Sequence, residues 1–470
     1  MSPYPSWLSP GDNAWQLAAA TLVGLMSVPG LVILYGGVVQ RKWAVNAMMM
    51  AFSGFSAVLL VWVLWGYRMG FGSPLKLGPG ILSSFIGQPG PVTGALSEQG
   101  RAGIPLLTGL MPNFRFPQST LVYFQFVFAA ITPLLFLGSV LGRMRFKSWL
   151  LFVPLWTTFV YSVNAFLLWG GGWWAQKGSV DYSGGYVIHL AAGISGFVAA
   201  AVVGPRLRRD RENSAPNNLL MVAAGAGLLW LGWNGFNGGD PYFAGADAAA
   251  AVLNTNLAAA TAVLVWMVWD MFVSGTPAFT GAVNGMIVGL VAITPAAGYV
   301  NGVGAIVIGL VASSIVWFSF NKLGSRGIFR RVDDTLGVVH THGVAGLVGG
   351  LLVGILADPH VIVYPGSGKT PGFSVTGLLY GNAHQLLVQA GAAVTVIVWD
   401  ALMTFVLLKL VGLVVPLRAS EEELEQGDLA VHGEEAYASE LVVIADGRVM
   451  TDLEGPSRAV ALEGAAEGEG

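Results

Sequence analysis

The chain has 470 residues, of which 54% are hydrophobic and only 10% are charged, whereas soluble domains carry about 25% charged residues. This composition excludes an ordinary soluble protein and indicates a protein that spans a lipid bilayer. The sequence contains no cysteine, which excludes disulfides, thiolate metal ligands and thiol nucleophiles. The net charge of −3 hides an asymmetry, because residues 1–415 carry 20 Lys and Arg against 12 Asp and Glu, and residues 416–470 carry 3 against 14. We therefore expect a membrane domain at 1–415 and an acidic tail at 416–470.

Eleven apolar runs have about the length of 20 residues that crosses a hydrocarbon core. They lie at 15–36, 48–72, 119–141, 149–170, 186–205, 217–238, 247–272, 279–299, 302–320, 335–357 and 384–413. The basic loops follow the first, third, fifth and ninth runs, which places them on one side of the membrane. By the positive-inside rule this side is cytoplasmic. The sequence therefore predicts an all-α polytopic protein of the cell membrane, with eleven transmembrane helices, an external N-terminus and a cytoplasmic C-terminus.

The segments between and before these runs give weaker signals. The two longest external loops, 73–117 and 358–383, are rich in Gly, Pro and Ser and show no helical period. We expect them to form ordered caps or turns. The first ten residues have no basic segment ahead of an apolar stretch, so the sequence predicts no signal peptide, although a removed one would be missing.

An internal repeat relates the fifth and tenth runs. The pattern D-x7-H-x2-A-G-x2-G starts at Asp181 and again at Asp334, and the tetrapeptide AITP at 130–133 recurs at 292–295. The chain is therefore interpreted as two five-helix repeats, about 12–205 and 217–357, followed by an eleventh helix at about 384–413. Because five is an odd number, the second repeat is expected to be inverted relative to the first.

Each repeat carries one histidine, His189 or His342, eight residues after its aspartate. Eight helical residues rise by about 12 Å, so both side chains reach towards the middle of a core about 30 Å thick. A single histidine in an apolar helix is more often a structural residue. Two at equivalent positions indicate a pore or a proton relay, because ionisable groups inside a membrane are costly. His340, two residues before His342, points to a different helix face, so we expect it off the pore axis.

Several segments resemble the ammonium transporter family, which also includes the Rhesus proteins. The longest runs from Asp181 to Arg206, DYSGGYVIHLAAGISGFVAAAVVGPR, and the others are PGLVILYGG, FQFVF, LLWGGGWW, GWNGFNGG, NGMIVGLVAITPAAGY, DDTLGVVHTHGVAG and LRASEEELEQGDLAVHGEEAY. The resemblance extends from residue 12 to residue 437. It implies a homotrimer of eleven-helix protomers, each with its own narrow pore, and it implies neither a cofactor nor a nucleic-acid partner.

The resemblance also implies roles for individual residues. It makes His189 and His342 the pore histidines, Phe128 and Phe236 the outer gate, Trp169, Phe124, Asp181 and Asp240 the recruitment site, and Gln125, Trp233 and Asp334 the supporting residues. Aromatic residues in membrane helices are more often core or lipid-facing, and only the motif context singles these out. We interpret Asp270 and Asp400 as structural partners, and Asp333 and Asp334 also suit the start of a helix.

The chemistry of these residue types fits a conductor of ammonium. Aromatic faces attract a cation by about 0.5–2 kcal/mol, which is weak enough for release. A bare cation in a dry pore would meet a penalty of several kcal/mol that neutral ammonia mostly escapes. Deprotonation near the phenylalanine gate is therefore expected, and imidazoles can donate or accept a hydrogen bond beyond it. Potassium cannot lose a proton, which would provide selectivity.

The sequence departs from the family pattern at three positions. Asp240 stands where the family usually has serine, Gly337 where aspartate is commoner, and His340 is additional. A carboxylate at position 240 would strengthen cation attraction and slow release, so Asp240→Ser is expected to weaken apparent affinity while leaving or raising the maximal rate. The alternative is that Asp240 turns outward before Pro241 and caps the loop.

Three functions stay open at this point: an ammonium transporter, a Rhesus-like channel for neutral gases and a non-conducting ammonium receptor. The aromatic recruitment residues and Asp240 favour the transporter. No nucleophile, base and orienting group occur together, so an enzyme is not expected, and no metal site is indicated beyond the histidine pair. The tail segment 417–437 resembles the family segment that docks PII-type signalling proteins. Beyond it, ELVVIADGRVM is expected to form a short strand pair and GAAEGEG to be disordered.

Overall fold

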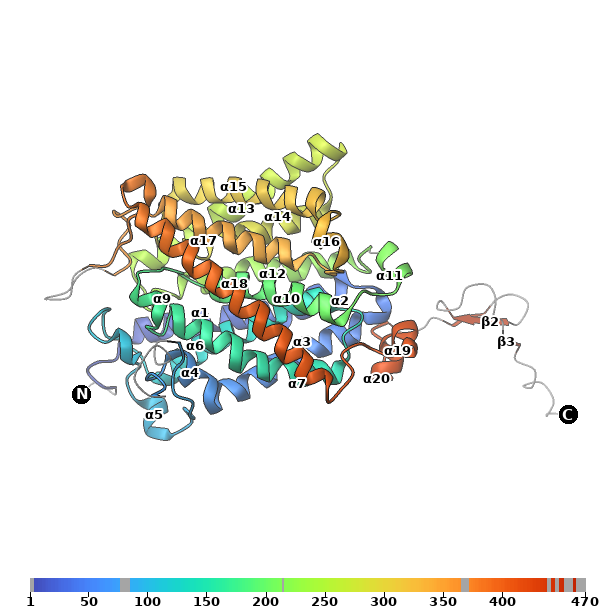
Figure 1. Cartoon of the computed structure of the whole chain (residues 1–470), viewed down its shortest axis with the longest axis horizontal. Helices are drawn as coiled ribbons and strands as arrows, with labels where there is room; N and C mark the ends of the chain where they lie inside the picture. Colours follow the sequence, from blue (N-terminus) through green and yellow to red (C-terminus); the bar gives the residue numbers. More distant parts are fainter. Residues whose placement is uncertain are drawn as a thin grey trace.

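The computed structural model describes residues 4–76, 85–213, 215–364 and 372–437, together with the backbone of three short strands. Long helices run side by side along the molecule (Figure 1). Ten helices are long and apolar enough to cross a membrane in the described ranges, and a shorter apolar helix spans Phe279–Ile293. The predicted all-α membrane fold is confirmed.

The spans follow the predicted order, and several are interrupted by a π-helical turn. The first five spans consist of α1 (Pro10–Leu25), η1 (Met26–Leu31) and α2 (Val32–Val38); η2 (Arg41–Trp43), α3 (Ala44–Val61), η3 (Trp62–Gly66) and α4 (Tyr67–Phe71); α6 (Gln118–Val140); α7 (Phe146–Trp156), η6 (Thr157–Tyr161) and α8 (Ser162–Leu168); and η7 (Gly185–Leu190) with α10 (Ala191–Val203). The remaining six are α12 (Leu219–Gly238); α13 (Ala246–Ser274); α14 (Phe279–Ile293); α15 (Gly302–Phe318) with η8 (Ser319–Leu323); η9 (Val339–Val344) with α17 (Ala345–Leu356); and α18 (Ala383–Gly412).

Short elements connect the spans or follow the last span. They are α5 (Ala95–Gln99), η5 (Pro105–Leu107), α9 (Trp173–Gln176), α11 (Arg208–Glu212), α16 (Gly327–Arg331), η10 (Leu378–Tyr380), α19 (Glu421–Gln426) and α20 (Asp428–His432). The strands β1 (Leu441–Val443), β2 (Arg448–Thr451) and β3 (Val460–Ala461) pair antiparallel in the order β1-β2-β3. The predicted strand pair corresponds to β1 and β2, whereas GAAEGEG lies outside the described residues.

The eighth helix ends earlier than the predicted run 279–299. It stops at Ile293, and the chain then turns. Pro295 lacks the amide hydrogen that would continue the helical hydrogen bonding, and Ala296 donates instead to the carbonyl of Ile293 at 2.8 Å, in a turn. The related Pro133 lies inside α6, which continues to Val140, so the two AITP segments differ in whether the helix continues past the proline. Their threonines behave alike, because each donates its hydroxyl to the carbonyl four residues back, at 2.8 Å and 2.7 Å.

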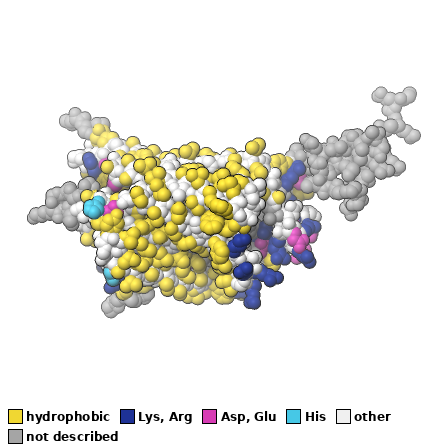
Figure 2. All heavy atoms as spheres, turned by 90° about the horizontal axis from the view of Figure 1, so that it is seen from above, with side chains coloured by type: hydrophobic (Ala, Val, Ile, Leu, Met, Phe, Trp, Pro, Cys, Tyr) yellow, Lys and Arg dark blue, Asp and Glu magenta, His cyan; other side chains and the backbone are white. Residues whose placement is uncertain are grey.

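Hydrophobic side chains cover the middle of the molecule, and Lys and Arg side chains gather at one end (Figure 2). This end carries α11, α16 and α19 (Figure 1). Its charges are partly neutralised inside the fold, since Arg206 pairs with Asp333 at 2.8 Å and Lys42 with Asp210 at 3.1 Å. Basic residues concentrate on the cytoplasmic side of membrane proteins. The basic end is therefore the cytoplasmic one, and the N-terminus lies outside.

The acidic tail returns to the cytoplasmic end through α19 and α20. The Asp428 carboxylate accepts the backbone N–H groups of Val45 and Asn46, both at 2.8 Å, near the start of α3. Arg145 pairs with Glu423 at 3.1 Å. A carboxylate at a helix N-terminus satisfies free amides and suits the helix dipole. The first part of the tail is thus packed on the membrane domain.

Candidate functional site

The two histidine-bearing segments, η7 and η9, start in the same way. The Asp181 carboxylate accepts the N–H groups of three residues in η7, at 2.6, 2.9 and 3.0 Å, and Asp334 accepts one N–H in η9, at 2.8 Å. Three residues after each aspartate stands a glycine with positive φ, Gly184 at 112° and Gly337 at 67°. Only glycine adopts such backbone readily. Gly337 is therefore the repeat equivalent of Gly184, and the shared D-x2-G pattern was a signal for this turn that we overlooked.

Glycines also let the two segments cross closely. A Cβ atom on Gly193 would lie 2.2 Å from the Cα of Gly343, and one on Gly346 would lie 3.1 Å from the Cβ of His189. Gly193 and Gly346 hold the same position in the repeat pattern, four residues after His189 and His342. Side chains there would push the segments apart. The repeated glycine therefore places the two histidines at the crossing point.

The rings of His189 and His342 lie side by side, with centroids 5.6 Å apart. His189 is fully buried, and neither of its ring nitrogens has a hydrogen-bond partner in the described parts of the chain. His342 Nδ1 lies 3.0 Å from the Thr341 hydroxyl. Buried polar atoms are nearly always hydrogen-bonded. Two unpartnered nitrogens on one buried ring are thus suited to a small polar molecule passing between the rings.

His340 has different surroundings. Its Nδ1 lies 2.8 Å from the hydroxyl of Ser319, in η8. Its ring packs on Phe329 and Phe320, at centroid distances of 4.9 and 5.7 Å. These contacts place His340 near α16 at the cytoplasmic end, away from His189.

An aromatic stack continues from the histidines towards the outer end. His189 stacks on Phe236 at 5.9 Å, and Phe236 lies 4.4 Å from Phe128. Trp169 meets Phe128 edge-on at 6.2 Å. Both phenylalanines are buried, at 0% and 1% exposure. Phe128 and Phe236 therefore lie between Trp169 and His189 in this stack.

The supporting residues fix this stack. Phe124 lies 4.8 Å from Phe128, and Gln125 donates its side-chain N–H to the Tyr242 hydroxyl at 2.9 Å. Trp233 stacks on His189 at 5.4 Å and donates its indole N–H to Thr294 at 2.9 Å. These bonds restrict the rotation of the aromatic side chains.

A cavity of about 240 Å³ lies at the outer end of the stack. We call it the outer cavity, and its lining includes Trp169, Asp181, Asp240 and several tyrosines. The indole N–H of Trp169 donates to the backbone carbonyl of Asp181 at 2.6 Å. Asp240 is 8% exposed and faces the outer cavity, so it does not turn outward to cap the loop before Pro241. Burial raises the pKa of Asp181 to about 6, against the opposing effect of its backbone hydrogen bonds.

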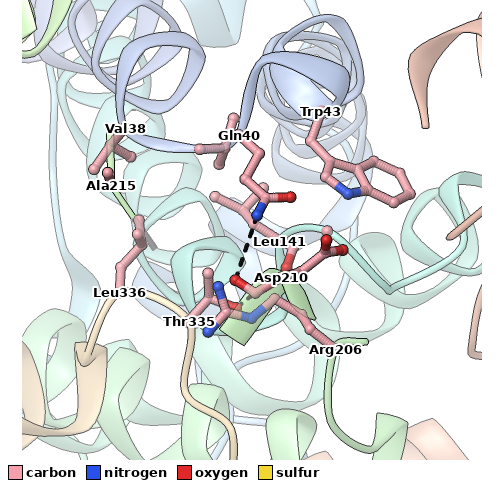
Figure 3. A pocket seen from close by; sticks show the side chains of 11 residues that line it. Val38, Gln40, Trp43, Leu141, Arg206, Asp210, Ala215, Thr335 and Leu336 are labelled. Carbon is pink, nitrogen blue, oxygen red and sulfur yellow. Dashed lines mark hydrogen bonds between the residues drawn. The ribbon is translucent and has the colours of Figure 1, made fainter. Parts of the chain in front are cut away.

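A second cavity of about 330 Å³, the inner cavity, lies on the cytoplasmic side of the histidine pair. His342, Trp233 and Asn284 are among its lining residues. An adjoining pocket shares Val38, Thr335 and Leu336 with it and leads towards Gln40 and Asp210, which are joined by a 3.4 Å hydrogen bond (Figure 3). No sequence motif indicated this cavity, because its lining residues come from many helices and are mostly apolar.

The described ranges contain no group of three or more His, Asp or Glu side chains placed to hold a metal ion. The arrangement is instead an outer cavity, an aromatic stack, a histidine pair and an inner cavity. Aromatic faces suit a small cation, and unpartnered imidazole nitrogens suit a small neutral polar molecule.

Comparisons with known proteins identify the family of the chain. The model described as Ammonium Transporter Family matches residues 14–437. The protein "Ammonium transporter 3 member 1" of Oryza sativa subsp. japonica is 50% identical over 445 residues, covering 92% of this chain and 89% of its own. "Ammonium transporter 2" of Arabidopsis thaliana is 50% identical over 437 residues, covering 92% and 89%. The crystal structure of Saccharomyces cerevisiae Mep2 has a TM-score of 0.76 at 30% identity and covers 89% of each chain. The chain therefore belongs to the Ammonium Transporter Family.

Proposed function

We propose that ammonium binds in the outer cavity, loses a proton near Phe128 and Phe236, and crosses between His189 and His342 as ammonia. Ammonium transport itself follows from membership of the family. The observation that carries the route is the His189–His342 pair, which is buried between two cavities and keeps unpartnered ring nitrogens. A neutral molecule that can both donate and accept hydrogen bonds suits such a pair.

The experiment that tests this function is ammonium uptake by liposomes that contain the purified chain. Saturable uptake above that of protein-free liposomes is expected, because a cation must first occupy the outer cavity. A gas channel would show uptake that does not saturate with ammonium, and a receptor would show none. Either result would contradict the proposal.

Trp169 offers a specific test of recruitment. Leucine at this position keeps an apolar side chain and removes the aromatic face, which is worth about 0.5–2 kcal/mol to a cation. We expect Trp169→Leu to raise the half-saturating ammonium concentration by about 2- to 30-fold with a smaller change in maximal rate. Trp173→Leu is the matched control, since Trp173 packs on Phe85 outside the stack. Unchanged half-saturation in Trp169→Leu would remove Trp169 from the recruitment site.

The family resemblance also leads us to propose a homotrimer and a PII-type protein as a cytoplasmic partner. The exposed apolar side chains on α13 and α18 provide surface for lipid or for neighbouring protomers. The acidic tail, packed on the basic end by Asp428 and Glu423, provides a folded cytoplasmic surface for a partner. The mass of the purified protein in detergent distinguishes a trimer from a monomer.

A further inference from the structure

Asp240 lies just beyond α12, the helix that carries Phe236. A tight turn after α12 directs the side chain of Asp240 into the protein. Tyr242 has a φ of 64° and is the one non-glycine residue with positive φ in the described ranges. Its hydroxyl accepts the Gln125 N–H at 2.9 Å. A positive φ at a non-glycine residue costs on the order of 1–3 kcal/mol, and this conformation persists where surrounding contacts stabilise it. The direction of Asp240 is therefore built into the fold.

One carboxyl oxygen of Asp240, Oδ2, is buried and has no hydrogen-bond partner in the described residues. The neighbouring Ser183 hydroxyl can donate either to the carbonyl of Phe236, at 3.2 Å, or to the Asp240 carboxyl group. Asp181, in the same cavity, uses both of its carboxyl oxygens on backbone amides. Of the two carboxylates in the outer cavity, Asp240 is thus the one with an oxygen available to a ligand.

No Lys, Arg or His side chain lines the outer cavity among the described residues. The titratable groups that interact electrostatically with Asp240 are Asp181 and five tyrosines, namely Tyr161, Tyr182, Tyr242, Tyr299 and Tyr364. Burial raises the pKa of Asp240, the Ser183 hydroxyl opposes this, and Asp181 adds to it. An ionised carboxylate without a counter-ion is costly in such surroundings. The empty cavity therefore favours the neutral acid.

We propose that Asp240 is the group to which bound ammonium gives its proton before ammonia passes the gate. The inference rests on the proposed function. Ammonium enters the outer cavity as the counter-ion of Asp240, and the proton that Asp240 carried leaves to the external water. An N–H bond of ammonium then breaks and an O–H bond forms at Oδ2, which turns a cation and an anion into two neutral groups. The electron pair of the broken N–H bond stays on nitrogen as the lone pair of ammonia, which moves past Phe236, and Asp240 is again protonated.

This transfer is favourable because a buried ion pair retains much of the desolvation penalty of both charges, whereas a neutral pair does not. The proton transfer also changes the expectation from the sequence that a carboxylate at position 240 slows the release of ammonium. The same oxygen that attracts the cation accepts its proton. Asp240 therefore speeds the step that it would hinder as a fixed charge.

Asp240→Asn tests the proposal, because asparagine keeps the shape of the side chain and cannot accept the proton. General-base catalysis typically contributes about 10²–10⁴-fold, so we expect the maximal rate of ammonium uptake into liposomes to fall by at least about ten-fold. Asp240→Glu, which keeps a carboxyl group, is expected to retain most of that rate. A wild-type maximal rate in Asp240→Asn would overturn the proposal and leave Asp240 a recruitment residue only.

A second measurement does not depend on transport. Infrared difference spectra of the wild-type chain against Asp240→Asn, without ammonium at neutral pH, are expected to show the carbonyl stretch of a protonated carboxyl group. A carboxylate signal in its place would overturn the proposal. If the proposed function itself were wrong, liposomes containing the wild-type chain would take up no more ammonium than protein-free liposomes.

Discussion

Leucine in place of His342 is expected to lower ammonium uptake by about 10- to 100-fold. Leucine has a similar volume and cannot form a hydrogen bond, so ammonia crossing the buried pair would be left with an unsatisfied polar group, at a cost of about 1–3 kcal/mol. His189→Leu is expected to have an effect of the same order, because the two rings face one passage. The measurement is the initial rate of uptake into liposomes with equal amounts of correctly folded protein.

His340→Leu is the matched control for this prediction. It removes a histidine two residues away, on another face of the same segment, and leaves the Ser319 hydroxyl without its partner. That loss is expected to destabilise the fold by about 1–3 kcal/mol while uptake stays near the wild-type rate. A variant of His340 that lost uptake while His342→Leu retained it would show that the pore is assigned to the wrong histidine.

Asp181→Ala is expected to have the second large effect, on both stability and transport. The carboxylate accepts three backbone N–H groups at the start of η7, the segment that carries His189. Each hydrogen bond to a charged group contributes about 1.5–3 kcal/mol. We therefore expect a markedly lower melting temperature and an uptake rate reduced by at least about ten-fold. Asp334→Ala is the control, because Asp334 accepts one N–H at the equivalent place, and its effect should be smaller.

The raised pKa of Asp181 predicts that the affinity for ammonium depends on external pH. Its pKa is raised to about 6 by burial, so its negative charge is present above pH 6 and is lost as the pH falls through that value. Attraction of ammonium to the outer cavity should weaken in the same range. Asp181→Asn lacks the charge at every pH, and its half-saturating concentration should change less between pH 7 and pH 5. An equal change in variant and wild type would assign the pH dependence to another group.

The sequence predicted the fold because its main signals are local. Apolar runs, basic loops and the spacing between Asp181 and His189 are all read along a single segment. The end of α14 was predicted too late because the apolar run continues to residue 299, whereas the helix ends at Ile293, before Pro295. In α6 the helix continues past the equivalent Pro133. Whether a helix continues beyond a proline depends on tertiary packing, which the motif does not contain.

For the same reason, the sequence predicted some features of the site and not others. Residues within named motifs, such as Phe128 and Phe236, lie in one stack, although their roles stay predictions. The direction of Asp240 depends on a strained turn at Tyr242 and on a distant bond to Gln125, so the sequence left it open. The inner cavity depends on side chains from many helices. Gly337 was the exception, since its equivalence to Gly184 was present in the sequence and was overlooked.

The claim that ammonium crosses as ammonia is tested most directly by comparing it with rubidium, a monovalent cation that has no proton to lose. Liposomes containing the wild-type chain would be given ammonium or radioactive rubidium at equal concentrations. Both ions can reach the outer cavity, but a bare cation must meet the several-kcal/mol penalty of a dry pore. The predicted result is fast ammonium uptake with rubidium entry no greater than in protein-free liposomes. Rubidium entry at a rate comparable to that of ammonium would contradict deprotonation at the gate.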